Sequence, residues 1–136
     1  MTLPEPVWLD RRILEAIHEQ LILEYGGSAG IRDAGLVESA LGRPRNKWLH
    51  EEDVDLPLLA ASYAYGLAKN HGFVDGNKRI AATALGVFLG LNRHELEVPE
   101  PELVSAILAI SKGEWTEAEL AAWVRDHVIP LEESEA

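Results

Sequence analysis

The chain has 136 residues, of which 47% are hydrophobic and 26% charged, and its formal net charge is −11. This length fits one domain over residues 1–136, and the absence of cysteine excludes disulfides and thiolate metal sites. The acidic excess argues against nucleic-acid binding, which needs clustered Lys and Arg. No apolar segment is long enough to cross a bilayer. The N-terminus also lacks the basic start and apolar run of a signal peptide, so we expect a cytoplasmic protein without a membrane partner.

The first part of the chain predicts two helices. Leu9, Ile13, Ile17 and Leu21 form one apolar stripe, typical of an amphipathic helix, which Gly26-Gly27 ends.

Asp33 is then placed to cap a shorter second helix, which Gly42 and Pro44 end. Residues 43–54 predict a loop or a short hairpin. Its basic stretch, residues 43–48, is either a partner contact or a solvated surface.

The third and fourth helices are predicted to be the central ones. The third covers about 56–70, with Asp55 as its cap and Pro57 tolerated in its first turn. The fourth follows residue 79. Both are apolar on almost every side, which is typical of helices buried among others. Residues 71–79 therefore join the two most buried helices.

The remaining elements are shorter. Residues 92–99 predict a loop, with an extended piece at 96–98, and a fifth helix covers about 100–112. A capping box at 116–119 begins a sixth helix, and the acidic tail, residues 132–135, is expected to fray. The predicted class is all-α, with about six helices.

One segment is not explained by local structure, namely the nine residues that join the central helices. Lys78 and Arg79 fall at the start of a helix, where a cation is unfavourable by a few tenths to about 1 kcal/mol. An anion held between the backbone N–H groups and these cations would reverse that sign. The sequence therefore predicts a phosphate site here. The segment reads His71-Gly72-Phe73-Val74-Asp75-Gly76-Asn77-Lys78-Arg79.

Each polar residue of this segment has a functional and a structural interpretation. His71 can serve as a base for an attacking hydroxyl, or it can simply end the third helix. Asp75 can hold Mg²⁺, which needs only one or two carboxylates besides phosphate oxygens, or it can form a turn with Gly76. Asn77 can contact phosphate or act as an N-cap. For Phe73 only a structural role is expected, namely that its ring anchors the loop in the core.

The pattern His71-x-Phe73-x-Asp75-Gly76-Asn77-Lys78-Arg79 resembles the signature of the Fic/Doc family, most closely its Doc (death-on-curing) toxin branch. The segment of residues 26–41 is similar to the N-terminal part of that branch. The resemblance covers about residues 9–125, and it implies an all-helical fold whose central helices flank the active loop.

The resemblance also implies roles for the residues. Proteins of this kind transfer part of ATP to a hydroxyl of a target protein. By position, His71 would be the general base and Asp75 would bind Mg²⁺. Gly76, Asn77, Lys78 and Arg79 would hold the phosphates. Such a transition state is loose, so positioning and charge neutralisation supply most of the catalysis.

Several positions depart from the wider family. Members that transfer AMP often have Pro at position 72, Gly at 78 and a second Arg at 82, where this chain has Gly72, Lys78 and Ala82. The last two differences match the Doc branch, which transfers the terminal phosphate. Gly76 is atypical of that branch, which tends to have Ala there. We therefore expect a protein kinase, with adenylyltransferase activity as the alternative.

The Doc branch supplies the toxin of toxin–antitoxin pairs, with translation elongation factor Tu as a known target. Some relatives carry an inhibitory Ser/Thr-x-x-x-Glu-Gly/Asn helix, a string that this sequence lacks. The resemblance thus implies an antitoxin protein in trans and a translation factor as substrate. Two alternatives remain, a nucleotide- or partner-binding module without turnover and a plain helical interaction protein.

Overall fold

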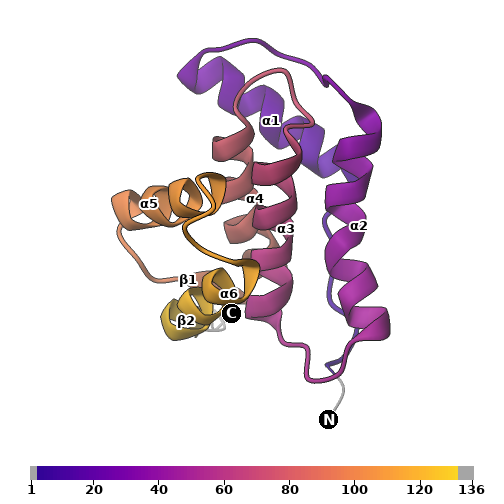
Figure 1. The fold of residues 1–136 in the computed structure, drawn as a ribbon, viewed down its shortest axis with the longest axis vertical. Coiled ribbons are helices and arrows are strands. Elements are labelled where there is room, and N and C mark those ends of the chain that lie inside the picture. Colours follow the sequence, from indigo (N-terminus) through magenta and orange to yellow (C-terminus); the bar gives the residue numbers. More distant parts are fainter. Residues whose placement is uncertain (1–2, 132–136) are drawn as a thin grey trace, which may run out of the picture.

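The computed structural model describes residues 3–131, and these are almost entirely helical (Figure 1). The elements in chain order are α1 (Arg11–Tyr25), α2 (Ala34–His50), α3 (Leu56–Asn70), α4 (Asn77–Leu91), β1 (His94–Leu96), α5 (Glu100–Ser111), α6 (Glu117–His127) and β2 (Val128–Pro130). The expected all-α class with six helices is confirmed over this range. None of these helices is both long and apolar enough to span a bilayer. The predicted acidic tail lies outside the described residues.

Helix α3 is the centre of the molecule, as its apolar sequence predicts. It packs against α2, α4, α5 and α6, with α2 on one side and α5 and α6 on the other in Figure 1. Leu59, Ile80 and Phe88 are fully buried here. Burying a side chain of this size contributes about 1.5–3 kcal/mol. The loop that joins α3 to α4 emerges at the end of the bundle that α1 crosses, so a rigid core supports it from both sides.

The predicted caps of these helices are confirmed. The side chains of Asp33 and Asp55 accept hydrogen bonds from the backbone N–H of the third residue of α2 and of α3, respectively. In the capping box, Thr116 Oγ1 accepts from the N–H of Glu119 at 3.1 Å, and Glu119 Oε1 accepts from the N–H of Thr116 at 3.0 Å. These bonds satisfy donors that a helix start leaves unpaired.

The predicted end of α2 is wrong, because the helix continues through Gly42 and Pro44 to His50. A proline inside a helix removes one hydrogen bond and costs about 3 kcal/mol. Pro44 is buried, and Ala40, four residues earlier, packs directly on Gly66 of α3. Packing on α3 therefore outweighs the missing bond. The expected loop shrinks to the residues between α2 and α3.

A two-stranded sheet was predicted only in part. β1 pairs with β2 in antiparallel register, with His94 opposite Pro130 and Leu96 opposite Val128. The extended piece expected at 96–98 thus lies two residues too late, and β2 was missed. Three-residue strands have no periodicity of their own, so the partner strand decides where they form.

Candidate functional site

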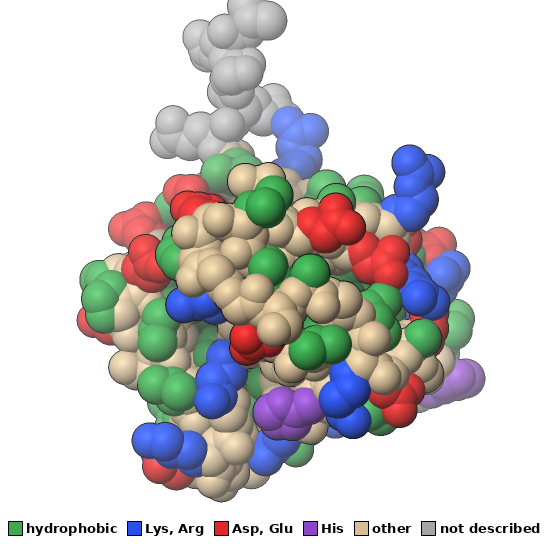
Figure 2. All heavy atoms as spheres, turned by 90° about the horizontal axis from the view of Figure 1, so that it is seen from above, with side chains coloured by type: hydrophobic (Ala, Val, Ile, Leu, Met, Phe, Trp, Pro, Cys, Tyr) green, Lys and Arg blue, Asp and Glu red, His purple; other side chains and the backbone are tan. Residues whose placement is uncertain are grey.

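The predicted site residues lie together at the junction of α3 and α4. They line one hollow of about 420 Å³, which we call the loop hollow. Figure 2 views the molecule from above, and several Lys and Arg side chains gather around a histidine in the lower part of that face. Such clustering is notable in a chain with net charge −11. The lining residues are His71, Val74, Asp75, Gly76, Asn77, Lys78 and Arg79.

The start of α4 is open to a ligand. Its N-cap is Gly76, in the left-handed conformation with φ 74°, and no side chain caps the first turn. The left-handed conformation favours glycine, because residues with a Cβ are strained in it. The N–H groups of residues 77–79 therefore face the hollow unpaired by a cap, at the positive end of the helix dipole. This is the geometry of an anion site.

Asn77 does not act as the N-cap, so that structural interpretation is wrong. It is the first residue of α4, and its side chain clamps the loop on itself. Asn77 Oδ1 accepts from the N–H of Phe73 at 3.1 Å, and Asn77 Nδ2 donates to the carbonyl of Phe73 at 3.0 Å. One amide N–H remains for a phosphate contact.

His71 stands at the C-cap of α3 in the left-handed conformation, with φ 52° and ψ 47°. This conformation is uncommon for a residue other than glycine, although histidine adopts it more readily than most. The residue is exposed, and its ring makes no hydrogen bond within residues 3–131. The Arg32 guanidinium fixes the backbone instead, donating to the carbonyls of His71 at 2.8 Å and Asn70 at 3.3 Å. The ring nitrogens are thus unpaired at the hollow that His71 lines.

Gly72 holds the loop against α2. A Cβ at this position would lie 2.6 Å from Val37 Cγ2 and 3.1 Å from its backbone nitrogen. The carbonyl of Gly72 also accepts from the N–H groups of Arg32 and Asp33, at 2.8 and 3.0 Å. Glycine at this position therefore follows from close packing against the first turn of α2.

Phe73 anchors the loop, as predicted. It is 2% exposed, and its ring stacks on His18 of α1 with 4.0 Å between centroids and 20° between planes. Its backbone forms an antiparallel bridge with Ile31, and the next N–H, of Val74, donates to Gly30 at 3.0 Å. Two segments far apart in the sequence thus position this loop.

The Asp75 carboxylate is held by two backbone amides. Oδ1 accepts from the N–H of Gly76 at 2.8 Å and Oδ2 from that of Ser28 at 3.2 Å. These bonds, followed by the nearby Arg79 charge, lower the pKa of Asp75 below its ordinary value. Gly27 makes room for the carboxylate, because a Cβ there would lie 2.7 Å from Oδ2. Asp75 is therefore a fixed, ionised carboxylate at the edge of the hollow.

The Asp75 carboxylate could supply some, but not all, of the ligands of a magnesium ion. Each Asp75 oxygen accepts one hydrogen bond, which leaves lone pairs for a cation. Among residues 3–131 no group of three or more His, Cys, Asp or Glu side chains could hold a metal. The ion would therefore need phosphate oxygens and water as its other ligands, as Mg²⁺ commonly does.

The two cations of the motif differ in their surroundings. Lys78 is exposed and forms no ion pair within the described part of the chain. The Arg79 guanidinium lies over the Tyr25 ring, 4.5 Å from its centroid. This contact leaves the guanidinium edge with its donors available. Both cations are thus available to bind an anion at the start of α4.

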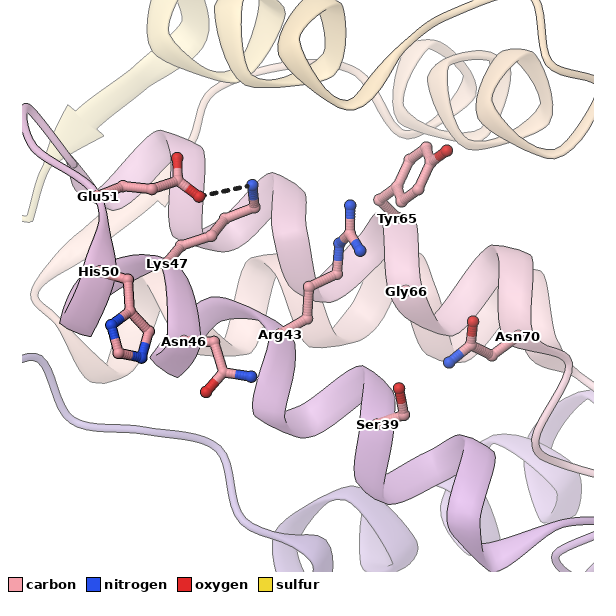
Figure 3. Close-up of a pocket in the computed structure, with 9 residues that line it drawn as sticks. All are labelled: Ser39, Arg43, Asn46, Lys47, His50, Glu51, Tyr65, Gly66 and Asn70. Atoms are coloured by element: carbon pink, nitrogen blue, oxygen red, sulfur yellow. Dashed lines mark hydrogen bonds and ion pairs between the residues drawn. The ribbon is translucent and has the colours of Figure 1, made fainter.

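A second hollow of about 440 Å³ lies between α2 and α3, and we call it the α2–α3 groove. Figure 3 shows the Lys47 amine paired with Glu51 and the Arg43 side chain reaching toward Tyr65. The basic stretch of residues 43–48, which the sequence predicted to lie in a loop, is part of α2. Its cations are paired, because Arg43 and Lys47 also contact Glu117 of α6 at 2.7 and 3.0 Å. The groove therefore offers little net charge to an anion.

Sequence reasoning missed the residues that position the site from outside the motif. They are His18, Arg32 and the backbone of Ser28, which contact the loop across at least 38 residues of chain. The sequence held one signal for His18, its place one helical turn after Leu14, and the structure buries both residues. A polar residue on an apolar helix face needs a partner. Arg32 and Ser28 carried no such signal.

Comparisons with known proteins identify relatives of this chain. The model of the Fic/DOC family matches residues 8–89. The chain is 33% identical to the protein kinase doc of Escherichia phage P1 over 112 residues, which cover 82% of this chain and 88% of that protein. It is 39% identical to the Toxin Doc of Mycolicibacterium smegmatis over 77 residues, 54% of this chain and 58% of that protein.

Proposed function

This chain belongs to the Fic/Doc family, and from that premise we propose that it is a Doc-type toxin that acts as a protein kinase. It transfers the terminal phosphate of ATP to a hydroxyl of a protein substrate. The name of the phage P1 relative, a protein kinase, supports this choice. So does the name of the mycobacterial relative, a toxin.

The observation that carries the proposal is the composition of the loop hollow. An imidazole without a ring hydrogen bond, a fixed carboxylate and an uncapped helix start flanked by Lys78 and Arg79 line the same space. Phosphoryl transfer needs these three elements, namely a base, a place for Mg²⁺ and groups that neutralise phosphate charge. The α2–α3 groove lacks an uncapped helix start and has paired cations.

In the proposed reaction the substrate hydroxyl oxygen attacks the terminal phosphorus of ATP. The bond from that phosphorus to the β-phosphate oxygen breaks, and ADP leaves. His71 accepts the hydroxyl proton. The amides of residues 77–79, together with Lys78 and Arg79, bind phosphate oxygens and stabilise their charge. Mg²⁺ held by Asp75 would add further charge neutralisation.

The partners follow from the same family. We propose a translation factor resembling elongation factor Tu as the substrate. We also propose an antitoxin protein that restrains the enzyme in trans, because the sequence has no Ser/Thr-x-x-x-Glu-Gly/Asn string. An acidic toxin of net charge −11 suits a basic surface on such an antitoxin.

AMP transfer on the same site is the second candidate. It would need phosphates bound so that the α-phosphorus meets the hydroxyl. The side chains at positions 78 and 82 favour transfer of the terminal phosphate. Lys78 lies in the first turn of α4, and Ala82 lies one turn beyond Arg79, where members that transfer AMP have a second Arg to bind phosphate. A third and weaker candidate is a module that binds nucleotide or a partner without turnover.

Labelled ATP separates these candidates. The purified protein is incubated with elongation factor Tu, Mg²⁺ and ATP labelled on either the terminal or the α-phosphate. Protein label from the terminal position alone supports the kinase. Label from the α-position alone means AMP transfer. Nucleotide binding without label from either position would contradict both the kinase and the adenylyltransferase activity. His71→Ala is the matched inactive control.

A further inference from the structure

We propose that His18 is a positioning residue for the loop hollow, although it lies 53 residues before His71 on a different helix. From α1 it holds the backbone at Asp75 and Gly76, so that the carboxylate and the open start of α4 face the same space. The consequence for transfer depends on the proposed kinase activity. The effect on the loop itself does not.

The contact between His18 and the loop is direct. His18 is 2% exposed, and its Nε2 lies 2.7 Å from the backbone carbonyl oxygen of Asp75. A carbonyl only accepts hydrogen bonds, so Nε2 carries the proton in this contact. The ring face stacks on Phe73. One buried ring thus contacts both the anchor of the loop and its carboxylate-bearing residue.

The carbonyl contact is coupled to the carboxylate through one peptide plane. The carbonyl of Asp75 and the N–H of Gly76 belong to the same peptide, and that N–H donates to Asp75 Oδ1. Because a peptide is planar, fixing its oxygen also fixes the direction of its N–H. His18 therefore orients the donor that holds the carboxylate.

The N-cap of α4 rests on the same ring. A Cβ built on Gly76 would lie 3.6 Å from His18 Nε2 and 3.6 Å from Ile22 Cδ1, both of them ordinary van der Waals distances. The ring of His18 thus packs against Gly76, which has no side chain to cap the amides of residues 77–79. Loss of the ring N–H frees this peptide to rotate and lets the loop sample other conformations.

A purely structural role for His18 predicts a different outcome, and shape-matched variants distinguish the two. His18→Phe keeps a ring that can stack on Phe73 but removes the N–H. His18→Gln keeps an N–H at similar reach but removes the ring. If His18 only fills space, the Phe variant resembles the wild type. If it positions the loop, the Gln variant does.

Hydrogen exchange on the protein without nucleotide tests the proposal directly. In His18→Phe we expect the Gly76 amide to exchange at least fivefold faster, with amides in the middle of α3 unchanged and His18→Gln close to the wild type. Unchanged exchange at Gly76 in His18→Phe would overturn the positioning role, whatever the transfer assay shows. Should His18→Phe not fold, His18→Leu replaces it.

The transfer assay then tests the consequence for the site. We expect His18→Phe to raise the Mg²⁺ concentration for half-maximal transfer about tenfold, and His18→Gln to restore most of the difference. Leu120→Ala is the matched control, because it cuts a buried α6 side chain remote from the loop. It should lower the melting temperature and leave the Mg²⁺ dependence unchanged. No transfer by the wild type, with faster Gly76 exchange in His18→Phe, would contradict the kinase and leave the positioning role supported.

Discussion

The loop hollow and the α2–α3 groove have similar volumes and both contain lysine and arginine, yet the two sites use those residues differently. In the groove, Arg43 and Lys47 converge on Glu117, whose side chain is only 13% exposed. In the loop hollow, Lys78 forms no ion pair within residues 3–131, and Arg79 rests on an aromatic ring and acts on Asp75 only through its nearby charge. The paired cations join α2 to α6, whereas Lys78 and Arg79 remain available to a ligand.

The difference shows that clustered basic residues alone do not identify a site. The stretch at 43–48 has more cations than residues 71–79, but each of them has an acidic partner. Arg43 and Lys47 pair with Glu117 of α6, and Arg45 pairs with Glu5 before α1. A site for an anion needs charge that the protein itself leaves uncompensated. Variants of each region should therefore affect different measurements.

The largest effect is expected at the base. His71→Ala should lower kcat for transfer by about 10²–10⁴-fold, because a positioned base contributes that much. ATP affinity should stay close to that of the wild type, since the imidazole is not a phosphate ligand in the proposed site. Rates from labelled ATP and calorimetric titration measure the two quantities. Unchanged transfer would remove His71 from its role.

The next largest effect is on stability, in the groove. Glu117→Ala leaves Arg43 and Lys47 without their shared partner and should reduce the free energy of unfolding by about 2 kcal/mol, less than for a fully buried pair because Arg43 is 41% exposed. Urea titration gives this value. Glu51→Ala is the matched control, since its half-exposed carboxylate contacts Lys47 at 3.3 Å and should cost below about 1 kcal/mol. A loss of ATP affinity in Glu117→Ala would contradict the view that the groove affects stability and not nucleotide binding.

Removing a cation from the loop hollow should act on binding. We expect Arg79→Ala to weaken ATP affinity about tenfold, near 1.5 kcal/mol, as one charge-assisted hydrogen bond predicts. The melting temperature without nucleotide should remain within a few degrees of the wild type. Arg45→Ala, at an exposed position of α2, is the matched control. If both variants bind ATP like the wild type, Arg79 does not contact phosphate.

Acid should distinguish the two regions further. Burial alone would raise the pKa of Glu117, but hydrogen bonds from Arg43 and Lys47 outweigh it and lower the pKa below 4.5. A lowered pKa in the folded state stabilises the protein above pH 4.5, and this stabilisation is lost as pH falls through the folded value. The stability difference between wild type and Glu117→Gln should therefore shrink below pH 4.5. A constant difference down to pH 3 would contradict this assignment.

The smallest effect is expected at Tyr25. Its ring supports the Arg79 guanidinium, and an exposed cation–π contact contributes about 0.5–1 kcal/mol. Tyr25→Leu should weaken ATP binding about twofold to fivefold, while Tyr25→Phe should match the wild type. Adding Arg79→Ala should abolish the difference between these two variants. Calorimetry on the four proteins measures this coupling.

The helices and the central loop could be predicted from sequence because their signals are local. The caps at Asp33 and Asp55 depend on neighbours within three residues. The apolar sequences of α3 and α4 identify them as central. Phe73 could be assigned to the core because it is a lone aromatic residue among polar ones. The common hollow followed from residues adjacent in sequence.

What could not be predicted depends on contacts between distant residues. Pro44 is tolerated because α2 packs on Gly66 of α3. β2 forms because β1 lies beside it after α6 has turned the chain back. His18 and Arg32 reach the loop from α1 and from the segment before α2. No local pattern in the sequence encodes these pairings.

The contact between Gly72 and Val37 limits how this protein could be redesigned. Any larger residue at position 72 would collide with a methyl group of Val37 and would press tightly on the main chain of α2. A smaller residue in place of Val37 relieves the collision but not the tight contact with the main chain. Exchange of Gly72 for alanine therefore requires a shift of α2, and a library that varies only these two positions should return glycine at 72 among its active members.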